Sequence, residues 1–306
     1  MTKDGPCNTQ YAIRNTYASP NSVLQTLKQA SDALAAAGCD TPRLDAEVLL
    51  AHALNRDRAW LYARPEQTLS PHQLSVYQAL VSCRARREPV AYLTGCKEFF
   101  GLEFSVTPDV LIPRPETERL VELALQWVAT TSSPPIIADV GTGSGAIAVT
   151  LAVHLPQAYV VATDTSPTAL VIAQRNAARH GVADRVQYVQ GDLLAPLAGG
   201  WRYSYFIVAN PPYLSQAELA AAPPEVARWE PRAALDGGPD GLSVIRRLLV
   251  VAADRLRPGG ALLVEIGAGQ GAEVLRLARR HFPQAMVEIA RDYAERDRLL
   301  AVRHAR

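Results

Sequence analysis

Neither sign of charge dominates this sequence, and that balance argues against one large class of functions. The 306 residues hold 31 Lys and Arg against 30 Asp and Glu, which gives a net charge of +1. A protein that grips nucleic acid through its phosphates needs a surplus of basic side chains on one face. We therefore expect no direct nucleic-acid binding.

Cysteine and long apolar runs are also scarce. The four cysteines all lie in the first third of the chain, and none are paired at metal-ligand spacing: Cys7, Cys39, Cys83 and Cys96. This pattern indicates reduced thiols and predicts no metal site. No apolar run approaches the roughly 20 residues that cross a bilayer, and the first ten residues lack the apolar core of a signal peptide. We expect a cytoplasmic protein without membrane contact.

Four segments of the chain differ in their patterns. Residues 1–20 are polar and aperiodic, which predicts a loose N-terminal extension. Residues 21–88 carry helical periodicity, with helices expected to start near Asn21, Thr41-Pro42, Arg58 and Ser70-Pro71. They predict a small helical bundle, nearly balanced in charge, that suits recognition of a protein substrate. Residues 89–115 contain an alternating stretch with a glycine and predict a β-hairpin connector to a catalytic domain over residues 116–306.

Strand and helix patterns alternate from residue 134 onward, and this predicts an α/β domain with a largely parallel sheet. Strands are expected at 136–140, 159–163, 186–190, 205–209, 261–266, 285–291 and 299–303. No helical pattern separates the last two strands. They are therefore expected to pair antiparallel, which gives the sheet an antiparallel final strand.

A glycine-rich loop follows the first of these strands and opens a helix. It reads Gly141-Thr142-Gly143-Ser144-Gly145, and Asp164 ends the next strand 19 residues after the last glycine. Glycines admit a ligand close to the main chain, and a carboxylate at this spacing suits a ribose. Asp192 and Leu193, after the third strand, are placed to meet an adenine ring. A tight structural turn is the alternative for the loop, and a turn or cap aspartate is the alternative for Asp192.

A second glycine-rich loop, Glu265 to Gly271, also follows a strand and opens a helix. Only two strands follow it, and no acidic residue ends the next strand at the right spacing. We interpret it as a tight strand–helix turn.

The stretch Asn210-Pro211-Pro212-Tyr213 directly follows the buried strand 205–209. Its prolines stiffen the chain, and their carbonyls are not needed by a sheet. Together with the Asn210 amide and the Tyr213 ring they suit a planar NH₂ group. Hydride transfer does not require such a group of acceptors, whereas methyl transfer onto an amide or amino nitrogen uses it. No Lys or Arg accompanies the first glycine loop, which also favours S-adenosylmethionine over a dinucleotide.

These motifs give the sequence a resemblance to the release factor glutamine methyltransferases, the HemK/PrmC family, over roughly residues 24–303. The resemblance is carried by residues 89–95, 98–102, 107–118, the first glycine loop, residues 210–213 and residues 230–242. It implies a class I S-adenosylmethionine-dependent methyltransferase sheet and a helical substrate-binding domain. It also implies S-adenosyl-L-methionine as cofactor, and as substrate the glutamine of the Gly-Gly-Gln motif of peptide chain release factors.

Several side chains are expected to act in such a reaction. Asn210 and the Pro211 carbonyl would accept the two amide N–H bonds beside the cofactor, with Pro212 alongside. Tyr213, helped by Phe99 or Phe100, would pack on the amide, although core packing is the alternative for these rings. Arg114 and Glu116 either brace the connector or cap a helix. The stretch 230–241 is either a lid or a surface loop.

Three other functions compete with this interpretation. One is an amino-group methyltransferase acting on nucleic acid, which usually needs a basic groove. A second is a glutamine methyltransferase acting on a ribosomal protein, against which residues 112–118 favour the release factor branch. The third is a non-enzymatic S-adenosylmethionine-binding scaffold, against which the intact Asn210–Tyr213 motif argues.

Overall fold

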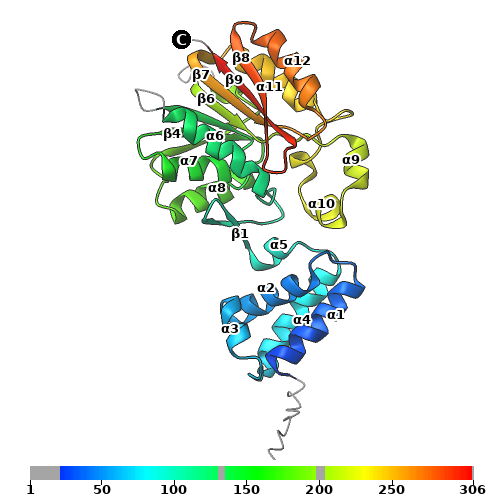
Figure 1. Cartoon of the computed structure of the whole chain (residues 1–306). Coiled ribbons are helices and arrows are strands. Elements are labelled where there is room, and N and C mark those ends of the chain that lie inside the picture. The colour runs from blue at the N-terminus through cyan, green and yellow to red at the C-terminus, as the bar shows by residue number, and fades with distance from the viewer. Residues whose placement is uncertain (1–20, 130–134, 198–203, 305–306) are drawn as a thin grey trace, which may run out of the picture. The chain divides into compact units, whose positions relative to one another are not determined.

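The computed structural model describes residues 21–129, 135–197 and 204–304 (Figure 1). The expected extension over residues 1–20 lies outside them. The chain divides into two compact units, Met1–Leu93 and Thr94–Arg306. This division falls inside the segment 89–115, where residues 90–94 are helical and the hairpin belongs to the second unit.

The first unit is a bundle of short helices, as the helical periodicity predicts. They are α1 (Val23–Ala36), α2 (Pro42–Leu54), α3 (Arg58–Ala63) and α4 (Pro71–Ala85), with α5 (Val90–Thr94) at its end. Ser22, not Asn21, caps α1, because its side chain accepts a hydrogen bond from the Gln25 N–H at 3.3 Å. The core buries an ion pair between Arg84 and Asp45, 2.7 Å apart. Buried charges of this kind are tolerated only when they are paired.

A seven-stranded sheet forms the centre of the second unit. The strands are β3 (Ile136–Val140), β4 (Tyr159–Asp164), β5 (Val186–Gln190), β6 (Ser204–Ala209), β7 (Leu256–Glu265), β8 (Ala285–Arg291) and β9 (Asp297–His304). Their order is β5-β4-β3-β6-β7-β9-β8. The first five pair in parallel, whereas β9 pairs antiparallel with both β7 and β8. The predicted fold class, including the antiparallel final strands, is confirmed.

Helices cover both faces of this sheet because its strands are apolar on both sides. Ile137 faces a core with α6 (Glu118–Val128) and α7 (Ala146–His154), and the next residue, Ala138, faces a core with α11 (Ser243–Ala253) and α12 (Gly271–His281). Among the residues described, no helix combines the length and apolarity needed to cross a bilayer.

The hairpin of β1 (Cys96–Phe99) and β2 (Leu102–Ser105) is tied to the first glycine loop through one buried amide. Asn176, on α8 (Pro167–Arg179), accepts from the Ser105 N–H at 2.8 Å and donates to the Ser105 and Ser144 carbonyls at 3.0 and 2.8 Å. The hairpin, α8 and the loop are therefore held in one arrangement.

Candidate active site

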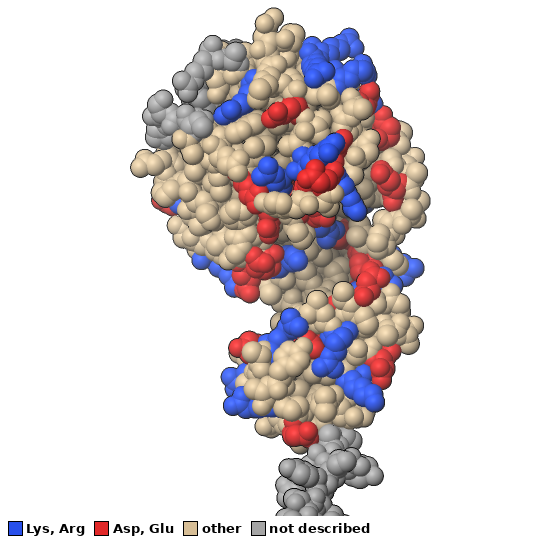
Figure 2. Space-filling view, in the orientation of Figure 1, with Lys and Arg blue, Asp and Glu red and all other residues tan. Residues whose placement is uncertain are grey.

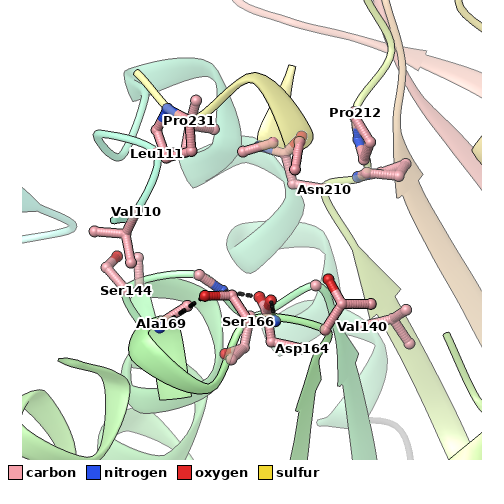
Figure 3. Close-up of a pocket in the computed structure, with 18 of the residues that line it drawn as sticks. Val110, Leu111, Val140, Ser144, Asp164, Ser166, Ala169, Asn210, Pro212 and Pro231 are labelled. Carbon is pink, nitrogen blue, oxygen red and sulfur yellow. Dashed lines mark hydrogen bonds between the residues drawn. The ribbon is translucent and has the colours of Figure 1, made fainter. Parts of the chain in front are cut away.

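A cavity of about 440 Å³ lies where β3, β4, β5 and β6 end. Ligands in open α/β sheets bind at this edge, beyond the carboxyl ends of the strands. Figure 3 shows Asn210, Pro212, Leu111 and Pro231 on one side of it, across from Asp164 and Ser166. The residues predicted from sequence that line it are Gly141, Thr142, Gly143, Ser144, Asp164, Asp192, Leu193, Asn210, Pro211, Pro212 and Phe99.

The glycines of the first loop have different tasks. Gly141 and Gly143 line the cavity with φ of 75° and 55°, a backbone conformation that side chains disfavour. Gly145, also at positive φ, does not line the cavity. A Cβ there would lie 3.0 Å from the Cβ of Ala173 on α8. Because it has no side chain, this glycine lets α7 pack closely on α8, and a contact of Gly145 with the cofactor stays a prediction.

The Thr142 hydroxyl is directed toward the core of the domain. It donates a hydrogen bond at 2.6 Å to Asp139, which is fully buried at the end of β3. The Ala148 N–H donates to the same carboxylate oxygen at 3.1 Å. Burial raises the pKa of Asp139 to about 7. The Asp139 carboxyl therefore supports the loop from the core side, and it is not among the residues that line the cavity.

Asp164 is held for a ligand by two backbone donors. Its Oδ2 accepts from the Gly143 N–H and its Oδ1 from the Ser166 N–H, both at 2.9 Å. Carboxylate oxygens have further lone pairs. The carboxylate can therefore accept additional hydrogen bonds from a ribose diol in the cavity.

Asp192 forms the far wall of the cavity together with an arginine that the sequence did not single out. Its carboxylate pairs with the Arg247 guanidinium of α11, and both side chains line the cavity. Leu193 follows in a left-handed conformation (φ 51°), and its carbonyl accepts from the Thr163 hydroxyl at 2.9 Å. An apolar side chain beside a carboxylate suits an adenine ring.

The Asn210 side chain belongs to a chain of hydrogen bonds that leads into the core. Its Nδ2 donates to the Thr117 hydroxyl at 3.1 Å, and that hydroxyl donates to Glu265 Oε2 at 2.7 Å. Tyr213 donates its phenol proton to Glu265 Oε1 at 3.2 Å. Glu265 is fully buried, which raises its pKa, and burial also raises the pKa of Tyr213 and keeps the phenol neutral. The carbonyl Oδ1 is the end of the Asn210 amide left for a ligand.

Tyr213 lines a second cavity of about 310 Å³ rather than the first. Asn210, Leu111, Arg114 and Ala234 line both, so the two spaces meet at Asn210. The other walls of the second cavity come from residues 214–235, including α9 (Gln216–Ala221) and α10 (Pro224–Trp229).

The two adjacent phenylalanines of the hairpin, Phe99 and Phe100, lie in different surroundings. Phe99 lines the first cavity and packs edge-on against Phe104, with ring centroids 6.1 Å apart. Phe100 lines neither cavity, since its ring packs edge-on against His154 on α7 at 5.1 Å. Of the two rings, Phe99 is therefore the one placed at the cavity, and a role of Phe100 in holding the substrate amide stays a prediction. Phe99 ends β1, whereas Phe100 lies in the turn of the hairpin with φ of 52°, so the strand geometry that directs the Phe99 ring does not extend to Phe100.

The stretch 214–241 is anchored at several points. Glu230 is buried, pairs with the Arg114 guanidinium and accepts from the Ile112 N–H at 3.2 Å. The Leu214 N–H donates to the Leu235 carbonyl at 3.0 Å. These contacts hold the stretch against the site in this structure, and Arg114 makes one of them. Glu116 lies in the first turn of a 3₁₀ helix, η1 (Pro115–Thr117).

Three side chains that shape the site were not predicted from the sequence: Thr117, Glu265 and Gln270. Gln270 donates to the Tyr213 carbonyl at 2.8 Å and accepts from the Gly267 N–H at 2.9 Å. The second glycine-rich loop does make the predicted strand–helix turn, and it also fixes Tyr213. The available signal was a glutamate that ends a buried strand beside β6.

The sequence matches known proteins over most of its length. Residues 25–95 match the PrmC N-terminal domain family, and residues 122–224 match the Methyltransferase small domain family. The Release factor glutamine methyltransferase of Moorella thermoacetica is 50% identical over 274 residues, which cover 90% of this chain and 95% of that protein. Its namesake in Geobacter sulfurreducens is 48% identical over 247 residues, covering 81% and 84%.

A solved structure shares the fold. The hMettl16 catalytic domain in complex with MAT2A 3'UTR hairpin 1 matches with a TM-score of 0.55 at 17% identity, covering 73% of this chain and 80% of that one. The sheet and its ligand edge are those of a class I S-adenosylmethionine-dependent methyltransferase. Identity near one half, across most of the length of the curated relatives, shows that this chain belongs to the release factor glutamine methyltransferase family.

Proposed function

We propose that this enzyme methylates the side-chain amide nitrogen of the glutamine in the Gly-Gly-Gln motif of peptide chain release factors, in the cytoplasm. The observation that carries the proposal is the Asn210 amide at the junction of two cavities, with its Nδ2 engaged by Thr117. An amide carbonyl held in this way is suited to accept an N–H from a substrate amide.

The first cavity fits S-adenosylmethionine, which supplies a methyl group on a positively charged sulfur. Its volume of about 440 Å³ lies in the range of small-molecule sites. Asp164 would hold the ribose, the glycine loop would lie along the ligand, and Asp192 and Leu193 would meet the adenine. Arg114 and Arg247, the arginines that line it, are each paired with a carboxylate, so neither offers a free charge to a pyrophosphate.

Asn210 and the Pro211 carbonyl would position the substrate nitrogen. The lone pair of an amide nitrogen is delocalised into its carbonyl, so the nitrogen attacks only when it is well aligned. Two acceptors for its N–H bonds aim the nitrogen and favour the positive charge that develops on it. Glu265 is engaged by Thr117 and Tyr213, and we assign it no role as a base. The proton leaves to water after transfer.

The second cavity would be the route by which a glutamine side chain reaches Asn210. It is lined mainly by apolar side chains, and Tyr213 and Asn210 are among the residues that line it. The apolar methylene groups of glutamine suit such a wall, and the Tyr213 ring, which also lines this cavity, would cover the amide.

The competing functions predict other surfaces. On the face drawn in Figure 2, basic and acidic side chains are interspersed, unlike a continuous basic groove. The nucleic-acid complex of the structural relative concerns that protein, and its 17% identity conveys the fold alone. Methylation of a ribosomal protein is the nearer alternative. Offering the enzyme release factor and ribosomal proteins as substrates distinguishes the two functions.

Labelled S-adenosylmethionine tests the proposal directly. The enzyme is incubated with release factor, with release factor carrying alanine in place of the Gly-Gly-Gln glutamine, with ribosomal proteins and with total RNA. Label is expected only on the intact release factor. Label on the alanine version, or on ribosomal proteins or RNA in its place, would refute the assignment.

A further inference from the structure

We propose that Thr117 and Glu265 are positioning residues that fix the polarity of the Asn210 amide and thereby select a substrate amide over a carboxylate. The inference rests on the proposed function, because it concerns the same substrate nitrogen. Thr117 is among the residues that line the first cavity, whereas Glu265 lies behind it, and the proposed role of both needs no contact with the substrate. Both act through Asn210.

An asparagine amide is nearly symmetric in shape but not in chemistry. Turning it by 180° exchanges a carbonyl acceptor for an NH₂ donor. Only the orientation with the carbonyl toward the cavity can accept an N–H of the substrate. The reverse orientation would place two NH₂ groups against each other.

The single proton of the Thr117 hydroxyl determines which orientation the Asn210 amide takes. The Thr117 hydroxyl has one proton, and Glu265 Oε2 accepts it at 2.7 Å. The hydroxyl oxygen can then only accept from Asn210, so Nδ2 points to Thr117 at 3.1 Å and Oδ1 points away. Tyr213 donates to the other Glu265 oxygen at 3.2 Å, which leaves the carboxylate an acceptor on both sides.

Burial raises the pKa of Glu265 above its usual value, and the nearby charge of Glu116 adds to the rise. The Thr117 hydroxyl, the charge of Arg298 and the Tyr213 hydroxyl act in the opposite direction. The role of Glu265 as an acceptor rests on the two hydroxyls that donate to it. Arg298 itself is held by Asp292, 3.3 Å away, and donates toward the Ile266 carbonyl at 3.4 Å. A neutral group in place of Glu265 could donate to Thr117 and so permit the reverse polarity.

The same polarity bears on specificity. A glutamate carboxylate has acceptors where glutamine has an NH₂ group, and it would face the Asn210 carbonyl and the Pro211 carbonyl. Sites built to hydrogen-bond one group reject its analogue because buried polar atoms are left without partners. A freely turning Asn210 amide would accommodate the carboxylate better.

Four variants test the inference: Thr117→Val, Thr117→Ser, Glu265→Gln and, as the matched control, Thr150→Val. The Thr150 hydroxyl is buried in α7 and has no hydrogen-bond partner among the residues that the structure describes, so its removal is the same chemical change without a broken network. Calorimetry with S-adenosylmethionine verifies that each variant keeps a folded first cavity. Single-turnover methylation of release factor and inhibition by release factor carrying glutamate in the Gly-Gly-Gln position are then measured.

Thr117→Val and Glu265→Gln are expected to lose about 10- to 100-fold in rate, because the aligned fraction of the amide falls. Their cofactor affinity should stay within about threefold, and the glutamate factor should inhibit roughly five- to tenfold better relative to KM. Thr117→Ser and Thr150→Val should behave as wild type.

Wild-type rate in Thr117→Val would overturn the inference. So would a lower rate with an unchanged ratio of inhibition to KM, since a merely structural role predicts that pattern. If Thr117→Val lost cofactor binding through misfolding, Glu265→Gln alone would decide. Failure of the wild-type enzyme to methylate release factor would refute the proposed function instead.

Discussion

The Asp164 carboxylate is bonded to the glycine loop itself: its Oδ2 accepts a hydrogen bond from the Gly143 N–H at 2.9 Å. Residues at the ends of two neighbouring strands thus position one another before any ligand binds. The Ser166 N–H fixes the second carboxylate oxygen at the same distance. Such an arrangement lowers the cost of ordering the site on binding.

Asp164→Ala should therefore weaken S-adenosylmethionine binding by about 1–3 kcal/mol, the range for a lost charge-assisted hydrogen bond. Calorimetry measures this, with circular dichroism as the check on folding. Gly269→Ala, in the second glycine-rich loop, is the control, because an added Cβ there meets nothing within 4 Å. Unchanged affinity in a folded Asp164→Ala variant would remove Asp164 from the cofactor site.

Gly145→Ala should destabilise the protein more than Gly143→Ala. Both positions have positive φ, which costs an alanine roughly 1–2 kcal/mol. Only at Gly145 does the added Cβ also collide with α8, 3.0 Å from the Ala173 Cβ, and overpacking adds about 1–3 kcal/mol. Urea unfolding gives the two values. Equal losses in the two variants would argue that α7 can shift and that close packing is not the role of Gly145.

The sheet was predictable from the sequence because its strands are apolar runs with turn-forming residues at their ends. Buried parallel strands read as apolar runs, and each was bounded by glycine, proline or aspartate. The sequence has no helical pattern between β8 and β9, which predicts that they pair antiparallel, and the structure confirms this pairing. Propensity could not decide between neighbouring cap candidates, and Ser22 rather than Asn21 caps α1.

The site was predictable where a residue's place at the end of a strand can be read from the sequence. Asp164 ends β4 and Asn210 directly follows β6, so both could be placed at the ligand edge by rule. Thr117 and Glu265 lie 148 positions apart and meet only because η1 packs beside the end of β7. Phe99 and Phe100 are adjacent, yet Phe99 ends β1 and faces the cavity, whereas Phe100 lies in the turn at positive φ and packs on His154.

The buried Asp139 should make stability fall as pH rises toward neutrality. Its pKa is raised from 3.8 to about 7 by burial, so between these values the folded state holds a proton that the unfolded state has lost. Stability then decreases with pH across that window and is lowest, as far as this group contributes, above about 7. Urea unfolding of wild type and Asp139→Asn from pH 5 to 8 measures the difference in their free energies of unfolding. Wild type should become less stable relative to the variant as pH rises toward about 7.

Asp240→Asn is the control for that experiment. The hydrogen bond from Arg246 lowers the pKa of the Asp240 carboxyl to about 2, so its contribution is lost only as pH falls toward that value. Its removal should leave the slope between pH 5 and 8 unchanged. A constant difference between wild type and Asp139→Asn over this range would mean that Asp139 does not titrate there.

Removing the first unit should separate cofactor binding from substrate recognition. We propose that the helical unit recognises the release factor. The residues that line the two cavities lie between Phe99 and Arg247, and the hydrophobic core of the helical unit is its own, over residues 23–93. A chain starting at Thr94 should bind S-adenosylmethionine within about threefold of the full chain. It should fail to methylate intact release factor, and normal methylation would give the helical unit another role.

Loss of Asn210 should be a defect in rate more than in cofactor binding. Asn210→Ala removes one of two proposed acceptors, so the substrate nitrogen loses alignment and charge stabilisation together. The expected cost is roughly 10²–10³ in turnover. Single-turnover methylation of release factor, with cofactor saturating, measures the step without the complication of product release.

Asn210→Asp is the sharper variant, because it keeps an acceptor but adds a negative charge. The charge lies where a sulfonium would bind, so cofactor affinity should be equal or higher. The carboxylate has no N–H to donate, so its contact with the Thr117 hydroxyl, which sits 3.1 Å from Nδ2, must change and shift the acceptor. Turnover should thus lie between the alanine variant and wild type. An alanine variant that methylates at nearly the wild-type rate would place the acceptor elsewhere and contradict the role given to the Asn210–Tyr213 stretch.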